Sequence, residues 1–293
     1  MSLPARIVDH EKPLNPAGIP WPIVRGQRPS FRISDLWRAP FHDFPIRDEI
    51  LYQCLPLSPG LDILEIGPGS GFTAFRLSRE VRHVSLLDVS DGAICQLQSR
   101  LQHIPNLSFF CADLCAPGLK DLIKREFDAL IGLAVAHLLP DPATALKNLA
   151  DVVSRGGRLV LQFPNYPPPK GTGITFFQHR RALDHMLEAA GFESWAIFAI
   201  QLRAHAQLIF EQFHERPLRA LRWLGSRNGN KEPLTYQATW AFQKGKKLEP
   251  LKYLMHAGWT VFSGAVHAGG DAFELLPLGE GILNRNLLLL ARR

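Results

Sequence analysis

One acidic residue and three glycines alternate along a short stretch of the chain. Glu65, Gly67, Gly69 and Gly71 occupy every second position within residues 61–72, which read LDILEIGPGSGF. Glycine lets the backbone take tight or left-handed angles, and it lets a ligand approach main chain that a Cβ would block. The spacing therefore predicts a turn that binds a nucleotide.

The residues on either side supply the elements that such a turn requires. The preceding run, LDILEI, is apolar enough for a buried parallel strand, and the following run, FTAFRLSREV, has the spacing of a helix. Strand, glycine turn and helix in this order form the context of a nucleotide-binding fingerprint. A dinucleotide fingerprint would place its third glycine where Phe72 stands, and the bulky ring opposes close packing of helix on strand. The turn therefore differs from the dinucleotide type.

The pattern E-x-G-x-G-x-G that begins at Glu65 resembles the first motif of the class I S-adenosylmethionine-dependent methyltransferases. Four later segments resemble the same family in the same order: HVSLLDVS, NLSFFCADL, FDALIGLAVAHLLPDP and LADVVSRGGRLVLQFPN. The resemblance covers residues 47–203 and the final strand. It implies an enzyme whose cofactor is S-adenosylmethionine and whose cofactor product is S-adenosylhomocysteine.

The resemblance also assigns cofactor contacts. Asp88, at the end of the second strand, corresponds to the acid that binds both ribose hydroxyls, and Asp113 corresponds to the acid that meets the adenine amino group. For Asp113 an alternative stays open, because an aspartate after a strand is often the N-cap of a helix. The cofactor-binding residues implied in this way are Glu65, Gly67, Pro68, Gly69, Gly71, Asp88, Val89, Ala112, Asp113 and Leu114.

Methyl transfer needs an aligned acceptor, exclusion of water and, for a hydroxyl acceptor, removal of a proton. His137 is the first candidate base, because the resemblance places it at the carboxyl end of the fourth strand; the alternative is a hydrogen-bonded structural histidine. Tyr166 is the second candidate, and Asn165 is a candidate to orient the acceptor. No metal site is expected, because there are no clustered carboxylates beyond those assigned to the cofactor. Further histidines that the sequence leaves unplaced are His179, His256 and His267.

The alternation of apolar runs and helical spacings predicts an α/β fold with a doubly wound, mostly parallel sheet of seven strands. The first six strands are predicted near residues 61–66, 83–88, 107–111, 127–134, 157–163 and 195–202. By resemblance to the family's Rossmann-like sheet, the last apolar run, 286–291, is an antiparallel seventh strand between the fifth and the sixth.

Three regions are predicted along the chain. Residues 46–203 and 281–293 form the cofactor-binding core. Residues 1–45, rich in proline and aromatic side chains, are interpreted either as a lid or as a segment that packs on the core. Residues 204–280 form a mostly helical insertion between the sixth and seventh strands. Because the sixth strand ends at the ligand-binding edge of the sheet, we expect this insertion to cap the acceptor pocket.

Positive charge is concentrated in the predicted insertion. Residues 211–252 contain nine basic and four acidic residues, in a chain with a net charge of +6. A basic amphipathic helix there fits a cap helix with a solvated face, peripheral contact with an anionic membrane, or an acidic substrate. This excess of positive charge is modest for a surface that binds a nucleic-acid phosphate backbone, and no RNA-binding motif is recognised. Both observations argue against a nucleic-acid partner.

Cysteine usage and hydropathy predict the cellular compartment of the protein. Cys54, Cys95, Cys111 and Cys115 form no C-x-x-C pair and are interpreted as reduced, mostly buried thiols. The N-terminus lacks the regions of a signal peptide, and no uncharged apolar run reaches membrane-spanning length. We therefore expect a cytoplasmic protein, with peripheral membrane contact as the alternative that the basic segment leaves open.

The favoured function is methyl transfer to a small hydrophobic or amphipathic acceptor, such as a lipid, a quinone or a specialised metabolite, with oxygen slightly favoured as the methylated atom. The apolar run 251–273 suits the lining of such an acceptor site and equally suits a second small core. Two alternatives remain. One is an RNA or protein methyltransferase that docks through the basic insertion, and the other is a protein that keeps the cofactor fold without transferring methyl groups.

Overall fold

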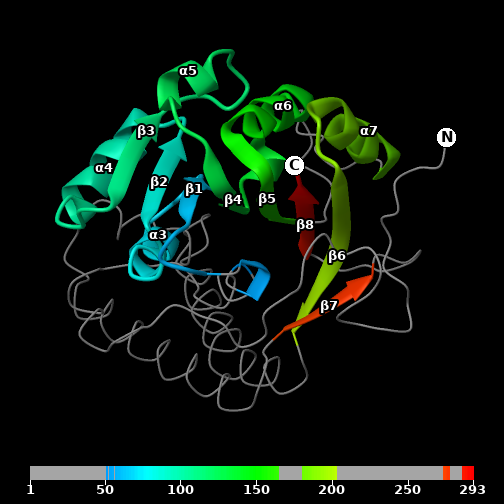
Figure 1. The fold of residues 1–293 in the computed structure, drawn as a ribbon, viewed down its shortest axis with the longest axis horizontal. Helices are drawn as coiled ribbons and strands as arrows, with labels where there is room; N and C mark the ends of the chain where they lie inside the picture. The colour runs from blue at the N-terminus through cyan, green and yellow to red at the C-terminus, as the bar shows by residue number, and fades with distance from the viewer. Residues whose placement is uncertain (1–50, 52, 56, 165–179, 203–272, 278–285) are drawn as a thin grey trace, which may run out of the picture. The chain divides into compact units, whose positions relative to one another are not determined.

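The computed structural model describes residues 51, 53–55, 57–164, 180–202, 273–277 and 286–293, along which strands and helices alternate (Figure 1). The strands form one sheet in the order β3-β2-β1-β4-β5-β8-β6-β7. In chain order the elements are β1 (Asp62–Ile66), α3 (Phe72–Leu77), β2 (His83–Asp88), α4 (Asp91–Leu101), β3 (Leu107–Cys111), α5 (Leu119–Ile123), β4 (Phe127–Leu133), the 3-10 helix η1 (Ala136–Leu138), α6 (Pro142–Val152), β5 (Val153–Pro164), α7 (Arg180–Ala190), β6 (Ser194–Leu202), β7 (Phe273–Pro277) and β8 (Asn286–Arg292).

The parallel part of the sheet follows from the apolar composition of its strands. Every residue of β1 is buried, and β1 pairs in parallel with β2 on one side and with β4 on the other. β3 extends the sheet beyond β2, and β5 extends it beyond β4, again in parallel. Strands covered on both faces carry near-continuous apolar runs, which is why these strands lie where the sequence predicted them.

β8 runs antiparallel to both of its neighbours, β5 and β6. Its residues 287–291 are buried. Since both neighbours are antiparallel to β8, β6 is parallel to β5 and ends at the same edge of the sheet as the first five strands. The predicted place of the last apolar run, between the fifth and sixth strands, is confirmed.

The sheet has one strand more than the seven predicted. β7 lies within residues 204–280, which were predicted as a mostly helical insertion, and it is the last strand beyond β6. A five-residue apolar run cannot be told from a piece of buried helix by its periodicity alone. Its last residue, Pro277, has no N–H to donate, and the end of an edge strand tolerates this loss.

β5 begins at Val153 rather than at the predicted Gly157. Phe127 of β4 faces Val153, whereas Ala129 faces Arg158, so β5 contains a bulge between these two pairs. Gly156 lies in this bulge with a φ of +76°. A left-handed residue in a bulge lets strand pairing continue through a Gly-Gly sequence that otherwise indicates a turn.

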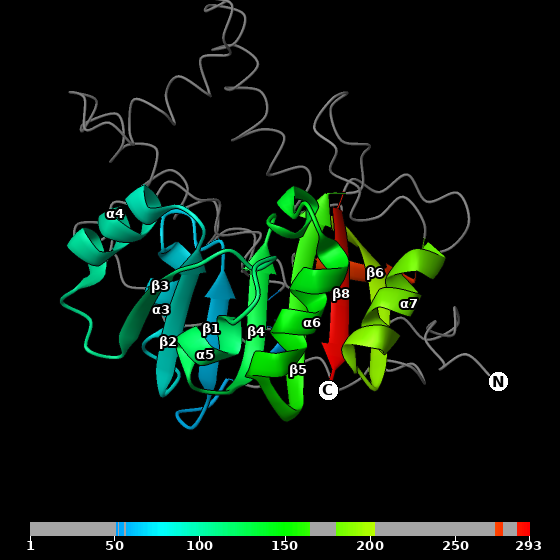
Figure 2. The same cartoon turned by 90° about the horizontal axis from the view of Figure 1, so that it is seen from above.

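Helices cover both faces of the sheet. Figure 2 shows α5, α6 and α7 in front of the sheet and α3 behind it. Apolar residues of α5, α6 and α7 form one core with residues of the central strands, including Leu64, Leu130 and Leu159. α4 lies on the side of α3, because its residues Leu97 and Leu101 contact Gly71, where α3 begins. The predicted doubly wound α/β architecture is therefore confirmed.

The described residues belong to one compact unit, apart from residues 202, 273 and 274. Residues 1–45 and, apart from β7, the predicted insertion 204–280 lie outside the described residues, so the predicted domain boundaries stay predictions. Among the residues that the structure describes, no helix is long and apolar enough to cross a membrane.

All four cysteines are free thiols, as predicted, but the prediction that most of them are buried is wrong. Only Cys54 is buried, and this burial raises the pKa of its thiol to about 12. Cys95 and Cys111 are exposed, because they lie on the outer side of α4 and at the end of β3.

Candidate functional site

The carboxyl ends of the first four strands meet at one edge of the sheet. Ile66 at the end of β1 faces Leu87 of β2 and Gly132 of β4, and Asp88 at the end of β2 faces Cys111 of β3. The loops after these strands therefore emerge side by side, at the edge where open α/β sheets bind ligands. This edge brings together His137 and the loops that carry the predicted cofactor residues at 67–71, 88–89 and 112–114.

The glycine turn after β1 is folded tightly onto its neighbours. Gly67 donates its N–H to the carbonyl of Leu87 at 2.9 Å, and Gly71 donates to the carbonyl of Pro68 at 2.8 Å. Gly67, Gly69 and Gly71 have φ values of +61°, +53° and +82°. These left-handed angles explain why glycine stands at alternate positions here.

Two of these glycines also make room for neighbouring side chains. A Cβ on Gly67 would lie 2.9 Å from Cγ2 of Val135, in the loop after β4. A Cβ on Gly71 would lie 2.7 Å from side-chain atoms of both Leu97 and Leu101. The turn is therefore held between the β4 loop and α4, with main chain rather than side chains at its surface.

Asp88 presents one carboxylate oxygen to the edge of the sheet. Its Oδ1 accepts the N–H of Ser90 at 2.8 Å, and no hydrogen bond joins Oδ2 to another described residue. Ser90 in turn caps α4, because its hydroxyl accepts the N–H of Ala93 at 3.3 Å. Val89, between them, is 69% exposed. A carboxylate fixed on one side and open on the other can accept hydrogen bonds from the hydroxyl groups of a ligand.

Asp113 has the same arrangement after β3. Its Oδ1 accepts the N–H of Cys115 at 2.8 Å, and the side chain is exposed. The alternative of a helix N-cap is wrong, since α5 begins after Gly118 and has no side-chain cap. Ala112 donates its N–H to the carbonyl of Asp88 at 3.0 Å, which joins the two acidic loops.

Leu114, also predicted near the adenine, is buried in the core. Asn148 of α6 donates to the carbonyls of Leu114 and Ala116 at 2.7 and 2.8 Å. The structure therefore gives Leu114 a role in anchoring the loop that carries Asp113. Glu65, in turn, is buried at 4% exposure within β1.

His137 lies in η1, directly after β4. Its ring is half-buried, and Nδ1 is buried without a hydrogen-bond partner among the described residues. Burial lowers the pKa of His137, so the neutral ring predominates at neutral pH. The roles of His137 as a base and as a hydrogen-bonded structural histidine both stay predictions. Leu138, the next residue, is 57% exposed.

Ala134 and Val135 link β4 to η1, and the sequence analysis assigned neither residue to the site. Ala134 has a φ of +52°, a left-handed angle that is uncommon for alanine. Both residues continue an apolar run, and a single apolar run predicts only a longer strand. Tyr166, Asn165, His179, His256 and His267 lie outside the described residues.

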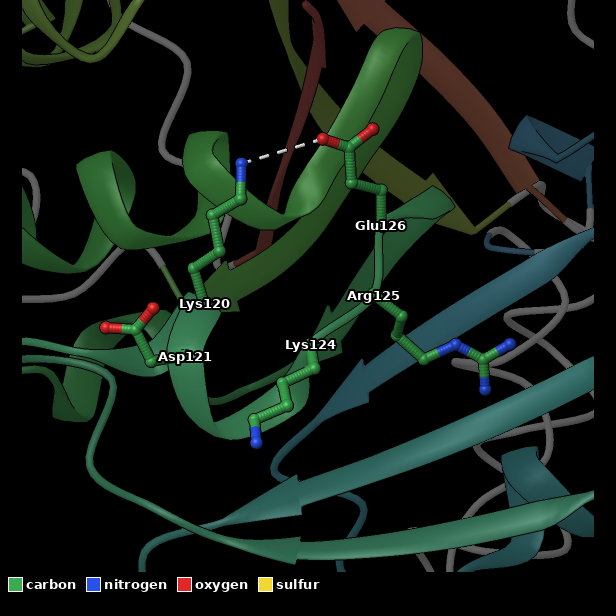
Figure 3. A pocket seen from close by; sticks show the side chains of 5 residues that line it. All are labelled: Lys120, Asp121, Lys124, Arg125 and Glu126. Carbon is green, nitrogen blue, oxygen red and sulfur yellow. Dashed lines mark ion pairs between the residues drawn. The ribbon is translucent and has the colours of Figure 1, made fainter.

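A surface hollow of about 390 Å³ lies away from this edge (Figure 3). It is formed by the end of α5 and the residues before β4, near the amino ends of the strands. Its lining is charged, and Lys120 pairs with Glu126 at 3.7 Å. Its side chains are Lys120, Asp121, Lys124, Arg125 and Glu126.

Comparison with known proteins gives one family match. Residues 64–161 match the model of a methyltransferase domain. The chain is 30% identical over 125 residues to an uncharacterized methyltransferase of Mycobacterium tuberculosis, covering 43% of this chain and 59% of that protein. It is 31% identical over 132 residues to the ubiquinone biosynthesis O-methyltransferase of Alkalilimnicola ehrlichii, covering 44% of this chain and 52% of that enzyme. The match thus spans little more than half the length of these relatives.

Among solved structures, the chain is similar to the YcgJ protein from Bacillus subtilis. The TM-score is 0.48 and the sequence identity is 12%, over 84% of this chain and 97% of that one.

Proposed function

We propose that the core of this chain is a class I S-adenosylmethionine-dependent methyltransferase domain and that the protein methylates a small hydrophobic or amphipathic acceptor, at oxygen. The observation that carries the proposal is the position of His137. A half-buried, neutral imidazole stands at the carboxyl end of β4, at the same edge as the glycine turn and Asp88.

The residues at this edge fit the cofactor. The three glycines of the turn at 67–71 all have left-handed φ angles, and a Cβ on Gly67 has no room beside Val135. Asp88 would hold the ribose hydroxyls through its open oxygen, and Asp113 would meet the adenine amino group. Val89, 69% exposed beside Asp88, offers an apolar surface for the purine ring. S-adenosylmethionine supplies an electrophilic methyl group on a positively charged sulfur.

His137 supplies the base in this proposal. Nδ1 is buried, so Nε2 is the ring nitrogen that an acceptor can reach. A neutral ring with its proton on Nδ1 has a lone pair on Nε2, which takes the proton of an acceptor hydroxyl as the oxygen becomes methylated. The lowered pKa keeps this lone pair available at neutral pH.

Two observations support an apolar acceptor. Leu138, 57% exposed, places an isobutyl group next to His137 at the same edge. The relative from Alkalilimnicola ehrlichii, 31% identical over the matched region, is named as an O-methyltransferase of ubiquinone biosynthesis. A phenolic hydroxyl on an apolar ring combines an acidic proton with an apolar body, and it is the acceptor type that we favour.

The test follows a methyl label. The purified protein is incubated with methyl-labelled S-adenosylmethionine and a fractionated bacterial lysate, and label is measured in organic extract, aqueous small molecules, RNA and protein. Label in the organic or small-molecule fraction, lost in Asp88→Asn and kept in Asp91→Asn, is the expected result. Asp91 is the matched control because it lies on the exposed first turn of α4.

The other outcomes point to the alternatives. Label in RNA or protein would replace the small-molecule acceptor with a macromolecule. Cofactor binding measured by calorimetry, without label in any fraction and without S-adenosylhomocysteine formation, would favour a protein that keeps the fold without transfer.

A further inference from the structure

The side chain of Val135 joins the glycine turn to the loop that carries His137. A Cβ on Gly67 would lie 2.9 Å from Cγ2 and 3.0 Å from Cβ of Val135, and a Cβ on Gly132 would lie 2.8 Å from its Cγ1. Gly67 follows β1, and Gly132 belongs to β4 and faces Ile66 across the sheet. Val135 therefore fills a socket that exists because two glycines, one directly after β1 and one in β4, lack side chains.

The backbone on either side of Val135 is fixed. Ala134 adopts a φ of +52° and donates its N–H to the carbonyl of Gln162 on β5 at 2.8 Å. The carbonyl of Val135 accepts the N–H of Leu138 at 2.8 Å, which closes η1. A left-handed alanine persists only where surrounding contacts hold it, and such residues cluster at functional sites. The hydrogen bond to β5 and the glycine socket are such contacts.

We infer that Val135 is a positioning residue that couples the glycine turn to His137, an inference that rests on the proposed function. Its side chain sets the turn's distance from the β4 loop, and its carbonyl begins the 3-10 helix in which His137 lies. Loss of the side chain would therefore loosen both the glycine turn and the 3-10 helix. We expect the turn then to lose its preorganisation for the cofactor and the 3-10 helix to loosen, which would let water reach Nδ1 of His137.

The test compares Val135→Ala with Val84→Ala. Val84 is a fully buried valine on β2 that pairs with Leu107 of β3, so its truncation reports a general loss of core packing. We expect Val135→Ala to weaken S-adenosylhomocysteine binding roughly ten-fold by calorimetry, while Val84→Ala changes it less than about two-fold. Thermal unfolding checks that both variants are folded.

A second readout needs no cofactor. The pKa of His137 is measured by NMR titration of its ring protons, with His137→Gln for assignment. In Val135→Ala it is expected to rise toward the ordinary histidine value, because hydration removes the cause that lowers it. In Val84→Ala it is expected to stay at the wild-type value.

Two further variants separate the side chain's shape from folding. Val135→Thr keeps the branched shape and is expected to bind within about three-fold of wild type. Gly132→Ala would place a Cβ 2.8 Å from Cγ1 of Val135 and 2.9 Å from Cδ2 of Leu161, so it should weaken binding alone and cost less in the Val135→Ala background, where only the contact with Leu161 remains. Gly132 does not have a positive φ, which makes this substitution compatible with its backbone.

The inference is overturned if Val135→Ala and Val84→Ala have equal affinities and equal His137 pKa values. If the wild type binds no S-adenosylhomocysteine, the proposed function fails, and the His137 titration alone then decides whether Val135 positions the ring.

Discussion

At the scale of single residues, the two acidic side chains at the edge of the sheet share one device. In Asp88 and Asp113 alike, Oδ1 accepts the N–H of the residue two positions later at 2.8 Å. This local hydrogen bond fixes the orientation of each carboxylate before a ligand arrives. In the proposed function, the second oxygen would meet the ligand without a loss of side-chain freedom, which is the advantage of preorganisation.

A substitution at Asp88 tests the importance of this carboxylate for binding. Asn in its place can still accept the N–H of Ser90, but it removes the charge that strengthens hydrogen bonds from ribose hydroxyls. We expect Asp88→Asn to weaken S-adenosylhomocysteine binding by about ten- to hundred-fold, in line with about 1.5–3 kcal/mol for bonds to a charged group. Calorimetry with Asp91→Asn as control makes the comparison. Equal affinity in both variants would remove Asp88 from the ribose site.

His137 predicts a pH dependence. Its pKa is lowered by burial, so the protonated, inactive ring predominates only below a pH that is lower than the ordinary histidine value of about 6.5. The rate of methyl transfer should therefore fall as pH drops through this lowered pKa and should be level around neutrality. His137→Gln should lower the rate by about 10²–10⁴-fold and abolish this acid limb. Unchanged turnover in the variant would show that the reaction proceeds without this base.

At the scale of secondary structure, α3 depends on packing rather than on capping. Its first residue follows Gly71, which gives no side-chain hydrogen bond, and its first turn has no acidic residue. All six of its residues are buried. The contact between Gly71 and the two leucines of α4 therefore fixes where the helix begins and joins the glycine turn to α4.

Gly71→Ala separates backbone strain from this contact. Gly71 has a φ of +82° and no room for a Cβ, whereas Gly118 has a φ of +88° and nothing within 4 Å of an added Cβ. Gly118→Ala should cost about 1–2 kcal/mol of unfolding free energy from strain alone. Gly71→Ala should cost about 1–3 kcal/mol more, because overpacking adds to the strain. Chemical denaturation measures both, and equal losses would mean that α4 yields to the new Cβ.

Prediction from sequence succeeded where one strong periodicity or one glycine pattern decided the structure. β1, β2 and β3 are short apolar runs, and β1 leads directly into the glycine pattern, so their places and the turn after β1 follow from composition. β7 and the early start of β5 were missed, because they depend on pairing with distant strands. Val135 was missed because its contacts also depend on residues that are distant in sequence. Its role comes from the absence of side chains on Gly67 and Gly132, which only the folded chain brings together.

At the scale of the whole molecule, stabilising and functional groups lie at opposite edges of the sheet. The open carboxylates and His137 lie at the carboxyl edge. At the amino edge, Asp62 of β1 accepts hydrogen bonds from Arg82 at 2.9 and 2.8 Å and from Arg125 at 2.8 Å. Its own N–H donates to Asp128 of β4 at 2.8 Å. These bonds join the starts of three neighbouring strands and stabilise the amino edge of the sheet.

Asp62 makes the fold sensitive to acid. Burial alone would raise its pKa, but hydrogen bonds and charge from Arg82 and Arg125 outweigh burial and lower it. Because the folded pKa is below the unfolded value of about 3.9, ionised Asp62 stabilises the fold above about pH 4. This stabilisation disappears as pH falls through the folded pKa.

Asp62→Asn should therefore lower the unfolding free energy by about 1–3 kcal/mol at pH 7 and by clearly less near pH 3. Denaturant unfolding of both proteins at the two pH values measures the difference. Asp121→Asn, an exposed residue of α5, should leave stability unchanged at either pH. A pH-independent loss in Asp62→Asn would mean that the side chain acts through its shape and neutral hydrogen bonds. A loss confined to neutral pH would instead locate the acid sensitivity of the sheet in one carboxylate, on the edge away from the proposed active site.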